Sequence, residues 1–338
     1  INGLAGVFTD ADLELLRSNL NVASIEEDGY AYTQSVTTQR VLLTHFECLT
    51  DANWDLGRIS SKTPVMNRNP NALIFPYKYD STAGAGTNVY IIETSAGQSI
   101  ANSFTSPLPS GGYPDADGNG HGIHCAGTAV SHPYGVAKAA NFIAVKILDD
   151  SGHGHISTDV YVPDSISGID WVAIATTNSR RPSVVCVSLG GRFMDSVNAA
   201  ADNLAASGVT TVVVAGDSST DAADFSPASA PSVITVGATD INNATASFSN
   251  YGAVLATWAP GVNVISTWND YRIKTLSGTS VATPYVVGFS AYLLGMYPYM
   301  IPSSVKSAIQ SMALNGVLSG VRKFINPSTS HEAHYSLQ

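Results

Sequence analysis

Hydrophobic residues in this chain gather into short continuous runs, and segments with helical spacing of apolar residues separate these runs. The runs are rich in Val, Ile and Thr, which is typical of strands buried on both faces of a parallel sheet. Strands are predicted at residues 87–93, 141–148, 183–189, 210–216 and 232–239, and helices at residues 124–130, 165–177 and 196–207. This alternation predicts an α/β fold in which helices cover both faces of a central parallel sheet.

The predicted sheet also indicates where a functional site is expected. In open parallel sheets, ligands bind outside the carboxyl ends of the strands. The residues that end or directly follow the predicted strands include Glu93, Asp149, Ser188 to Gly191 and Asp217. We expect the site to be built from members of this group.

Residues 1–40 have the pattern of a small α/β fragment that precedes the main sheet. Thr9 is a candidate N-cap with Asp12 three residues later, and a strand is predicted within residues 22–33. A fragment of this size is too small for a core of its own, so it must pack against another part of the protein. Gly, Pro and Asp are frequent at residues 103–120, which predicts a loop there.

Composition excludes several classes of protein. The 338 residues carry a net charge of −10 and contain no run of Lys or Arg, so no nucleic acid partner is expected. The most apolar stretch, residues 281–300, is interrupted by Pro284, Gly288, Gly295 and four tyrosines, which predicts a buried helix and no membrane span. The three cysteines show no C-x-x-C spacing, so no zinc site is expected.

Ser280 lies in the segment GTSVATP, at the start of the last apolar helix. Gly278 allows the backbone to approach a ligand closely, and Pro284 suits the first turn of a helix. A serine at such a position is most often an N-cap, but it is also a candidate nucleophile with an amide that could stabilise an oxyanion. His121 lies between two glycines in GNGHGIHCAGT, where it is either a surface histidine or a general base.

Taken together, the segments GNGHGIHCAGT, SLGG and GTSVATP resemble the subtilisin family of serine proteases, and SPASAPSVITVGATD, FSNYG and KILDDSGHG resemble its proteinase K-like branch. The resemblance covers most of residues 54–315. It implies a subtilisin-like three-layer fold with a central parallel sheet and the activity of a serine endopeptidase. The catalytic residues that it implies are the nucleophile Ser280, the general base His121 and, at the position of the third triad member, Glu93.

The resemblance also implies how a polypeptide substrate binds. Two segments match those that pair with an extended peptide, and glycines in them allow the substrate strand to approach. They comprise Gly152, His153, Gly154, His155 and Ile156 in the first, and Ser188, Leu189, Gly190 and Gly191 in the second. Asp217 and the amide of Ser280 match the oxyanion site, whereas His124 and Cys125 match positions beside the base that are not catalytic.

Residues 1–40, with GLAGVF and LRSNLNVASIEEDG, resemble the second half of the inhibitory propeptide of this family. The expected domains are therefore a propeptide fragment at residues 1–40 and a subtilisin-like peptidase domain at residues 41–338. Maturation is expected between Thr38 and Asp51. The resemblance further implies a secreted monomer whose partners are polypeptide substrates and its own propeptide, with no nucleic acid or membrane partner.

Two residues depart from the family pattern at the catalytic site. Glu93 stands where the family has aspartate, so the charge is kept but the side chain is longer by one methylene. Asp217 stands where the family has an asparagine that donates a hydrogen bond to the oxyanion. An ionised carboxylate accepts but cannot donate, and removing such a donor costs about 10²–10³ in turnover.

A further departure concerns calcium. Pro231 and Val233 match positions whose carbonyl groups ligate calcium in the proteinase K-like branch, but the matching carboxylate position is Ala256. Calcium prefers several oxygen ligands including carboxylates. We therefore expect no cofactor for catalysis, no metal ligand in the site, and a calcium position that lacks its carboxylate.

Two functions remain compatible with these residues. The first is a subtilisin-type endopeptidase, with turnover reduced by Glu93 and Asp217. The second is a protease-like protein with little or no catalysis that binds peptides or proteins. The intact Ser280 and His121 motifs favour the first.

Overall fold

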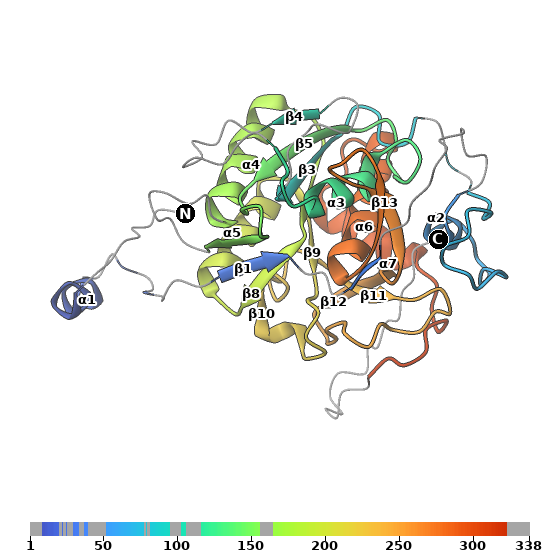
Figure 1. The fold of residues 1–338 in the computed structure, drawn as a ribbon. Coiled ribbons are helices and arrows are strands. Elements are labelled where there is room, and N and C mark those ends of the chain that lie inside the picture. Colours follow the sequence, from blue (N-terminus) through green and yellow to red (C-terminus); the bar gives the residue numbers. More distant parts are fainter. Residues whose placement is uncertain are drawn as a thin grey trace.

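The protein was analysed as a computed structural model (Figure 1). The structure describes residues 9–19, 22, 25, 30–33, 37–39, 52–77, 79, 82–94, 103–105, 116–155 and 165–322. The expected substrate residue Ile156 and the expected maturation segment between Thr38 and Asp51 lie largely or wholly outside these ranges.

The centre of the fold is a parallel sheet that, in the described part of the chain, has seven strands in the order β12-β11-β9-β7-β3-β5-β4. The strands are β3 (Asn88–Glu93), β4 (Ser103–Thr105), β5 (Asn141–Lys146), β7 (Ser183–Val187), β9 (Thr210–Val214), β11 (Ile234–Thr239) and β12 (Leu255–Pro260). Every residue of β3, β7, β9 and β11 is buried, which explains their continuous apolar sequences.

Helices cover both faces of this sheet, so the fold has three layers (Figure 1). On one face lie α3 (His121–Val130) and α6 (Thr279–Met296), with α2 (Trp54–Ile59) and α7 (Pro302–Met312) packed into the same apolar core. On the other face, α4 (Ser165–Ser179) and α5 (Asp195–Ala206) form a second core with the opposite side chains of the strands. The predicted three-layer α/β fold with a central parallel sheet is confirmed.

Two smaller sheets lie beside the main one. In the first, the strand order is β10-β8-β1-β6, formed by β1 (Tyr30–Thr33), β6 (His153–His155), β8 (Leu189–Arg192) and β10 (Phe225–Ser226). The second has the order β13-β14-β2, formed by β2 (Thr37–Gln39), β13 (Val264–Thr267) and β14 (Ile273–Ser277). Strands from the N-terminal segment thus complete both smaller sheets.

Local sequence signals explain several element boundaries. The predicted N-cap Thr9 begins α1 (Asp10–Arg17), and its hydroxyl and amide exchange hydrogen bonds with Asp12 in a capping box. A short 3₁₀ helix, η1 (Ala222–Asp224), follows Asp221, whose side chain accepts from the amide of Ala223.

One predicted loop is wrong in part. Residues 103–105 were expected to begin a loop but form β4, the edge strand of the main sheet. All the Gly and Pro residues of this stretch lie after residue 105. These turn signals obscured the short strand that precedes them.

The apolar stretch at residues 281–300 lies mainly in α6, whose residues are largely buried. In the part of the chain that the structure describes, no helix combines the length and apolar character needed to cross a membrane. The burial of α6 agrees with the buried helix predicted at residues 281–300.

Candidate active site

Three side chains from distant parts of the chain meet at the carboxyl end of the main sheet. Nε2 of His121 lies 2.9 Å from Oγ of Ser280, and Nδ1 of the same ring lies 2.9 Å from Oε1 of Glu93. Glu93 ends β3, His121 begins α3 and Ser280 is the second residue of α6. The structure therefore brings together the hydroxyl, imidazole and carboxyl groups that the sequence motifs singled out.

Glu93 is fully buried, and its two oxygens have different surroundings. Oε2 accepts a hydrogen bond from the amide of Thr94 at 2.8 Å. Oε1 is close to His121, but no donor in the described part of the chain is aligned for a hydrogen bond to it. Glu93 therefore places its negative charge beside the imidazole of His121, but the N–H of the ring does not point at Oε1 as in a good hydrogen bond.

The imidazole of His121 is almost entirely buried. Burial acts to lower its pKa, but the carboxylate of Glu93 and the side chain of Cys125 outweigh this and hold the pKa of His121 well above its usual 6.5. Sγ of Cys125 lies 3.9 Å from Nδ1 of His121, and burial raises the pKa of this thiol. Cys125 is a free buried cysteine.

The start of α3 is fixed by two side chains that sequence reasoning missed. The carboxylate of Asp117 accepts hydrogen bonds from the amides of Gly120 at 2.6 Å and Ile123 at 3.0 Å, while the hydroxyl of Thr94 accepts from the amide of Gly122. These bonds hold the backbone on both sides of His121. The helix begins at His121, three residues before the predicted start at residue 124, and Asp117 lies four residues before the observed start.

Pro284 leaves the carbonyl group of Ser280 without its usual partner in the helix. Pro284 was predicted to lie in the first turn of this helix, but it is the sixth residue of α6. Because proline has no N–H, it cannot donate to the carbonyl of Ser280, four residues earlier. That carbonyl instead accepts from Sγ of Cys125 and Oγ of Ser188, both at 3.4 Å. The backbone of Ser280 is thereby tied to α3 and to the segment after β7.

Asp217 follows β9 and lies beside the start of α6. Its Oδ1 accepts a hydrogen bond from the amide of Thr279 at 2.9 Å, the residue before Ser280. Loss of hydration on burial raises the pKa of Asp217 to about 7. A carboxyl group with this pKa changes charge near neutral pH, and it is hydrogen-bonded to the residue before Ser280.

The two segments expected to bind substrate are paired with a strand of the chain itself. β1 lies between β6 and β8 and is antiparallel to both, with Tyr32 opposite His153 on one side and Gly190 on the other. A Cβ at Gly190 would lie 3.1 Å from the carbonyl oxygen of Ser226, so this glycine makes room for β10 on the other side of β8. A strand of the N-terminal segment thus lies between the described strands of these two segments.

A second strand of the N-terminal segment pairs with the strand that precedes Ser280 in the chain. β2 pairs antiparallel with β14, with Thr37 opposite Ser277, three residues before Ser280. Only three residues separate Thr33, the last residue of β1, from Thr37. The N-terminal segment thus contributes β1 to the sheet of β6 and β8, and β2 to the sheet of β14.

Comparisons with known proteins agree with this geometry. The subtilase family model matches residues 60–330, which is most of the chain. The chain belongs to the subtilase family.

Similar proteins support the same assignment. This subtilase is 40% identical over 327 residues to a cuticle-degrading protease of Metarhizium anisopliae, covering 95% of this chain and 78% of the relative. It is 41% identical over 296 residues to proteinase R of Parengyodontium album, covering 86% of this chain and 70% of the relative. It also resembles a crystal structure of a cold adapted subtilisin-like serine proteinase, with a TM-score of 0.71 and 35% identity, covering 82% of this chain and 97% of the other.

These similarities identify the subtilase as a serine endopeptidase of the proteinase K-like type, so its substrates are polypeptides. The resemblance predicted from the His and Ser motifs is confirmed.

Two residues near the site do not contribute to this cluster. Asp149 instead shapes the turn before β6, where its Oδ1 accepts from the amides of Ser151 and His153 at 2.9 Å. His124 is buried against β13 and β14, with Nε2 3.1 Å from the carbonyl of Lys274, and burial lowers its pKa to about 3. A neutral, buried His124 agrees with the prediction that it is not catalytic.

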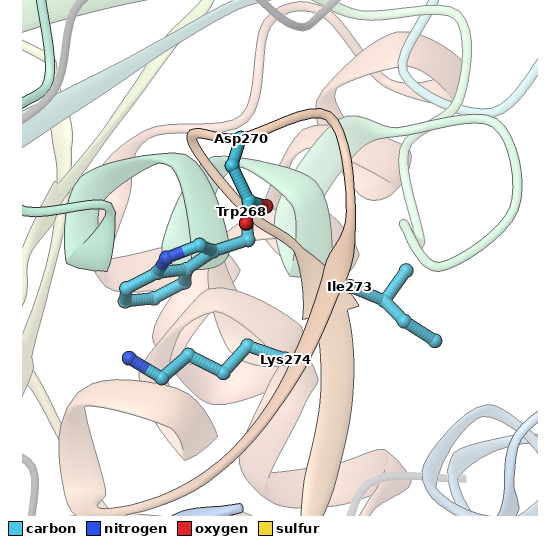
Figure 2. A pocket seen from close by; sticks show the side chains of 4 residues that line it. All are labelled: Trp268, Asp270, Ile273 and Lys274. Carbon is cyan, nitrogen blue, oxygen red and sulfur yellow. The ribbon is translucent and has the colours of Figure 1, made fainter. Parts of the chain in front are cut away.

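A cavity of about 250 Å³ lies at the β13–β14 hairpin and is lined by Trp268, Asp270, Ile273 and Lys274 (Figure 2). Nζ of Lys274 lies 3.6 Å from the centre of the Trp268 ring, a cation–π contact that holds both side chains on one side of the hairpin. Ile273 points to the other side. None of the three clustered residues lines this cavity, so it is not the site of the chemistry.

Among the described residues, no three His, Cys, Asp or Glu side chains form a cluster that could hold a metal ion.

Proposed function

We propose that this subtilase hydrolyses peptide bonds with Ser280 as nucleophile, His121 as general base and Glu93 as the residue that orients the imidazole. The observation that carries this proposal is the 2.9 Å contact between His121 Nε2 and Ser280 Oγ, with a carboxylate at the opposite ring nitrogen. Oγ attacks the peptide carbonyl carbon while His121 takes its proton. His121 then gives this proton to the leaving amine, and water releases the acyl group by the same steps.

Asp217 and the amide of Ser280 are the proposed oxyanion group. When Asp217 is protonated, its O–H can donate to the developing negative charge, as an asparagine would. When it is ionised, it repels that charge. Because the pKa of Asp217 is raised to about 7 while His121 must be neutral to act as base, the two requirements oppose each other as pH changes.

We propose that substrate polypeptides add as an extended strand between β6 and β8, at Gly152 to Ile156 and Ser188 to Gly191. The support is that β1 already pairs with the described strands of both segments. Main-chain hydrogen bonds of this kind supply affinity largely independent of sequence, while pockets for alternate side chains supply specificity.

The first substrate of the enzyme is proposed to be its own N-terminal segment. The support is that β1, which ends at Thr33, pairs with β8, while β2, which begins at Thr37, pairs with β14 near Ser280 in the chain; the proposed cut lies between these two strands. This proposed cut lies before the segment between Thr38 and Asp51 that the resemblance implies. The leader of a secreted, monomeric peptidase would thereby act as both inhibitor and substrate.

Reduced turnover is part of this proposal. Both departures, the unaligned Oε1 of Glu93 and the carboxyl group of Asp217, act on the transition state and leave the binding strands intact. The alternative is a subtilase that binds peptides with little or no hydrolysis, and the same two residues favour it.

Hydrolysis of an internally quenched peptide library tests the proposal against the alternative. The purified enzyme is compared with Ser280→Ala and with Ser303→Ala, a matched change at an exposed serine of α7. We expect cleavage by the parent and by Ser303→Ala, and none by Ser280→Ala. Equal, negligible rates in all three, with retained peptide binding, would support the binding protein.

A further inference from the structure

The segment before β11 is held by side chains from two helices. Nζ of Lys306 in α7 donates to the carbonyl of Val233 at 2.7 Å and to that of Pro231 at 3.1 Å. Between them, the amide of Ser232 donates to Oδ1 of Asp202 in α5 at 2.9 Å. Charged side chains therefore bind two carbonyl groups and one amide group of this turn.

These two carbonyl groups are the ones that the family resemblance assigns to a calcium ion, and the residues present do not fit one. Calcium takes about 6–8 oxygen ligands, usually with carboxylates among them. The side chain at the matching carboxylate position is the buried methyl group of Ala256, which offers no oxygen. Both carbonyls are already directed at an ammonium group, which would repel a cation.

The next turn of α7 makes a related contact. Nε2 of Gln310, four residues after Lys306 and on the same helix face, lies 3.5 Å from the carbonyl of Ala256. One face of α7 thus contacts both the turn before β11 and the start of β12. Val305 and Ile309 anchor the helix, because both are completely buried in the main core.

We propose that the ammonium group of Lys306 takes the place of the calcium ion at this position, so that the protein holds this turn without a metal. The charge is consistent with this exchange. A divalent ion with one carboxylate has a net charge of +1, as does a lysine beside an alanine. An ammonium group also donates up to three hydrogen bonds, which suits two convergent carbonyls.

The surroundings keep this ammonium group in place. Burial lowers the pKa of Lys306, while the carboxylate of Asp202 opposes that change and favours the charged form. The same Asp202 binds the turn through Ser232. The ammonium group of Lys306 in α7 and the carboxylate of Asp202 in α5 therefore both hold the same short turn.

Thermal unfolding tests this proposal, with all variants in a Ser280→Ala background so that self-digestion and the proposed activity do not enter. Lys306→Met keeps most of the side-chain stem but removes the charge. Lys62→Met, at an exposed lysine, is the matched control. A third variant combines Lys306→Met with Ala256→Asp, which restores a carboxylate and removes the competing cation. Each melting temperature is measured in a chelator, in excess calcium and in excess magnesium.

We expect the background protein and Lys62→Met to melt at the same temperature in chelator and in calcium. Lys306→Met should melt about 2–5 °C lower, since hydrogen bonds from a charged donor are lost. The double variant should regain stability in calcium but not in magnesium, which demands a tighter geometry. The proposal is overturned if Lys306→Met melts like Lys62→Met, or if calcium stabilises the background protein as much as the double variant.

Discussion

Glu93 and His121 lie 2.9 Å apart, yet the carboxylate oxygen that faces the imidazole is not aligned to accept its hydrogen bond. The other oxygen is held by the amide of Thr94. Glu93 therefore places negative charge at Nδ1 of His121, while Nε2 of the same ring faces Ser280. Catalysis in this subtilase is expected to depend on that charge.

Glu93→Gln should remove the charge while keeping the shape of the side chain. Loss of the orienting carboxylate costs about 10⁴ in the worked serine-protease triad, so we expect kcat/KM to fall by about 10³–10⁴. The pKa of His121 should also fall, because the anion that raises it is gone. The pH profile of kcat/KM measures both effects. Glu93→Asp, which keeps the charge, serves as control, and a Gln variant as active as the parent would contradict this role.

Asp217→Asn should raise turnover, and the gain should grow with pH. The pKa of Asp217 is raised to about 7, so below that pH the protonated carboxyl can donate to the oxyanion and the asparagine brings little benefit. Above it, the ionised carboxylate is repulsive, and the gain should approach about 10²-fold. The amide oxygen of asparagine can still accept from Thr279. The ratio of kcat between the two proteins, measured from weakly acidic to alkaline pH, tests this. A constant ratio would show that Asp217 does not titrate at the site.

The N-terminal segment should be cut between Thr33 and Thr37 when Ser280 is present. Cleavage there would leave β1 and β2 on separate chains, each paired with its own strand. Intact-mass analysis and N-terminal sequencing of the purified protein would locate the new terminus, with Ser280→Ala as the uncleaved control. A terminus between residues 38 and 51 would instead support the position suggested by family resemblance.

Asp55 should make stability depend on pH. Its side chain in α2 is completely buried, and loss of hydration raises its pKa from 3.8 to about 7. Because the folded pKa is above the unfolded value, the unfolded state ionises first. The free energy of unfolding should therefore fall as pH rises from about 4 to about 7, by at most about 1.4 kcal/mol per pH unit.

Asp55→Asn keeps an oxygen that can accept from the amide of Leu56, the present partner of Oδ1 at 2.8 Å. In the Ser280→Ala background, this variant should resemble the parent near pH 4 and be more stable near pH 8 in chemical denaturation. The exposed Asp195→Asn is the control. Parallel pH curves for all proteins would rule out this role for Asp55.

Sequence alone predicted the parts of the site that depend on strand direction. Glu93 and Asp217 end or follow parallel strands, so both had to lie at one edge of the sheet, where the starts of α3 and α6 bring His121 and Ser280. The repeated apolar runs also predicted the order of the main strands and helices along the chain. Asp149 also follows a strand, but its nearest amides are those of its own turn, which a pattern of strands does not show.

Other features required the three-dimensional structure because they join residues with no shared sequence pattern. The carbonyl of Ser280 lacks a helical partner owing to Pro284, but only the fold shows that Cys125 and Ser188 replace it. The sequence likewise predicted that Ala256 removes a calcium ligand. It did not indicate that Lys306, fifty residues later, points at the two remaining carbonyls.

The central claim is that Ser280 is an activated nucleophile, and covalent labelling with a fluorophosphonate probe tests it most directly. The mature protein is treated at weakly acidic and at alkaline pH, and the labelled peptide is identified by mass spectrometry. We predict labelling at Ser280 that is faster at the higher pH, where His121 is neutral, and absent in Ser280→Ala. No labelling of Ser280 at any pH, in a folded protein freed of its N-terminal segment, would contradict the account.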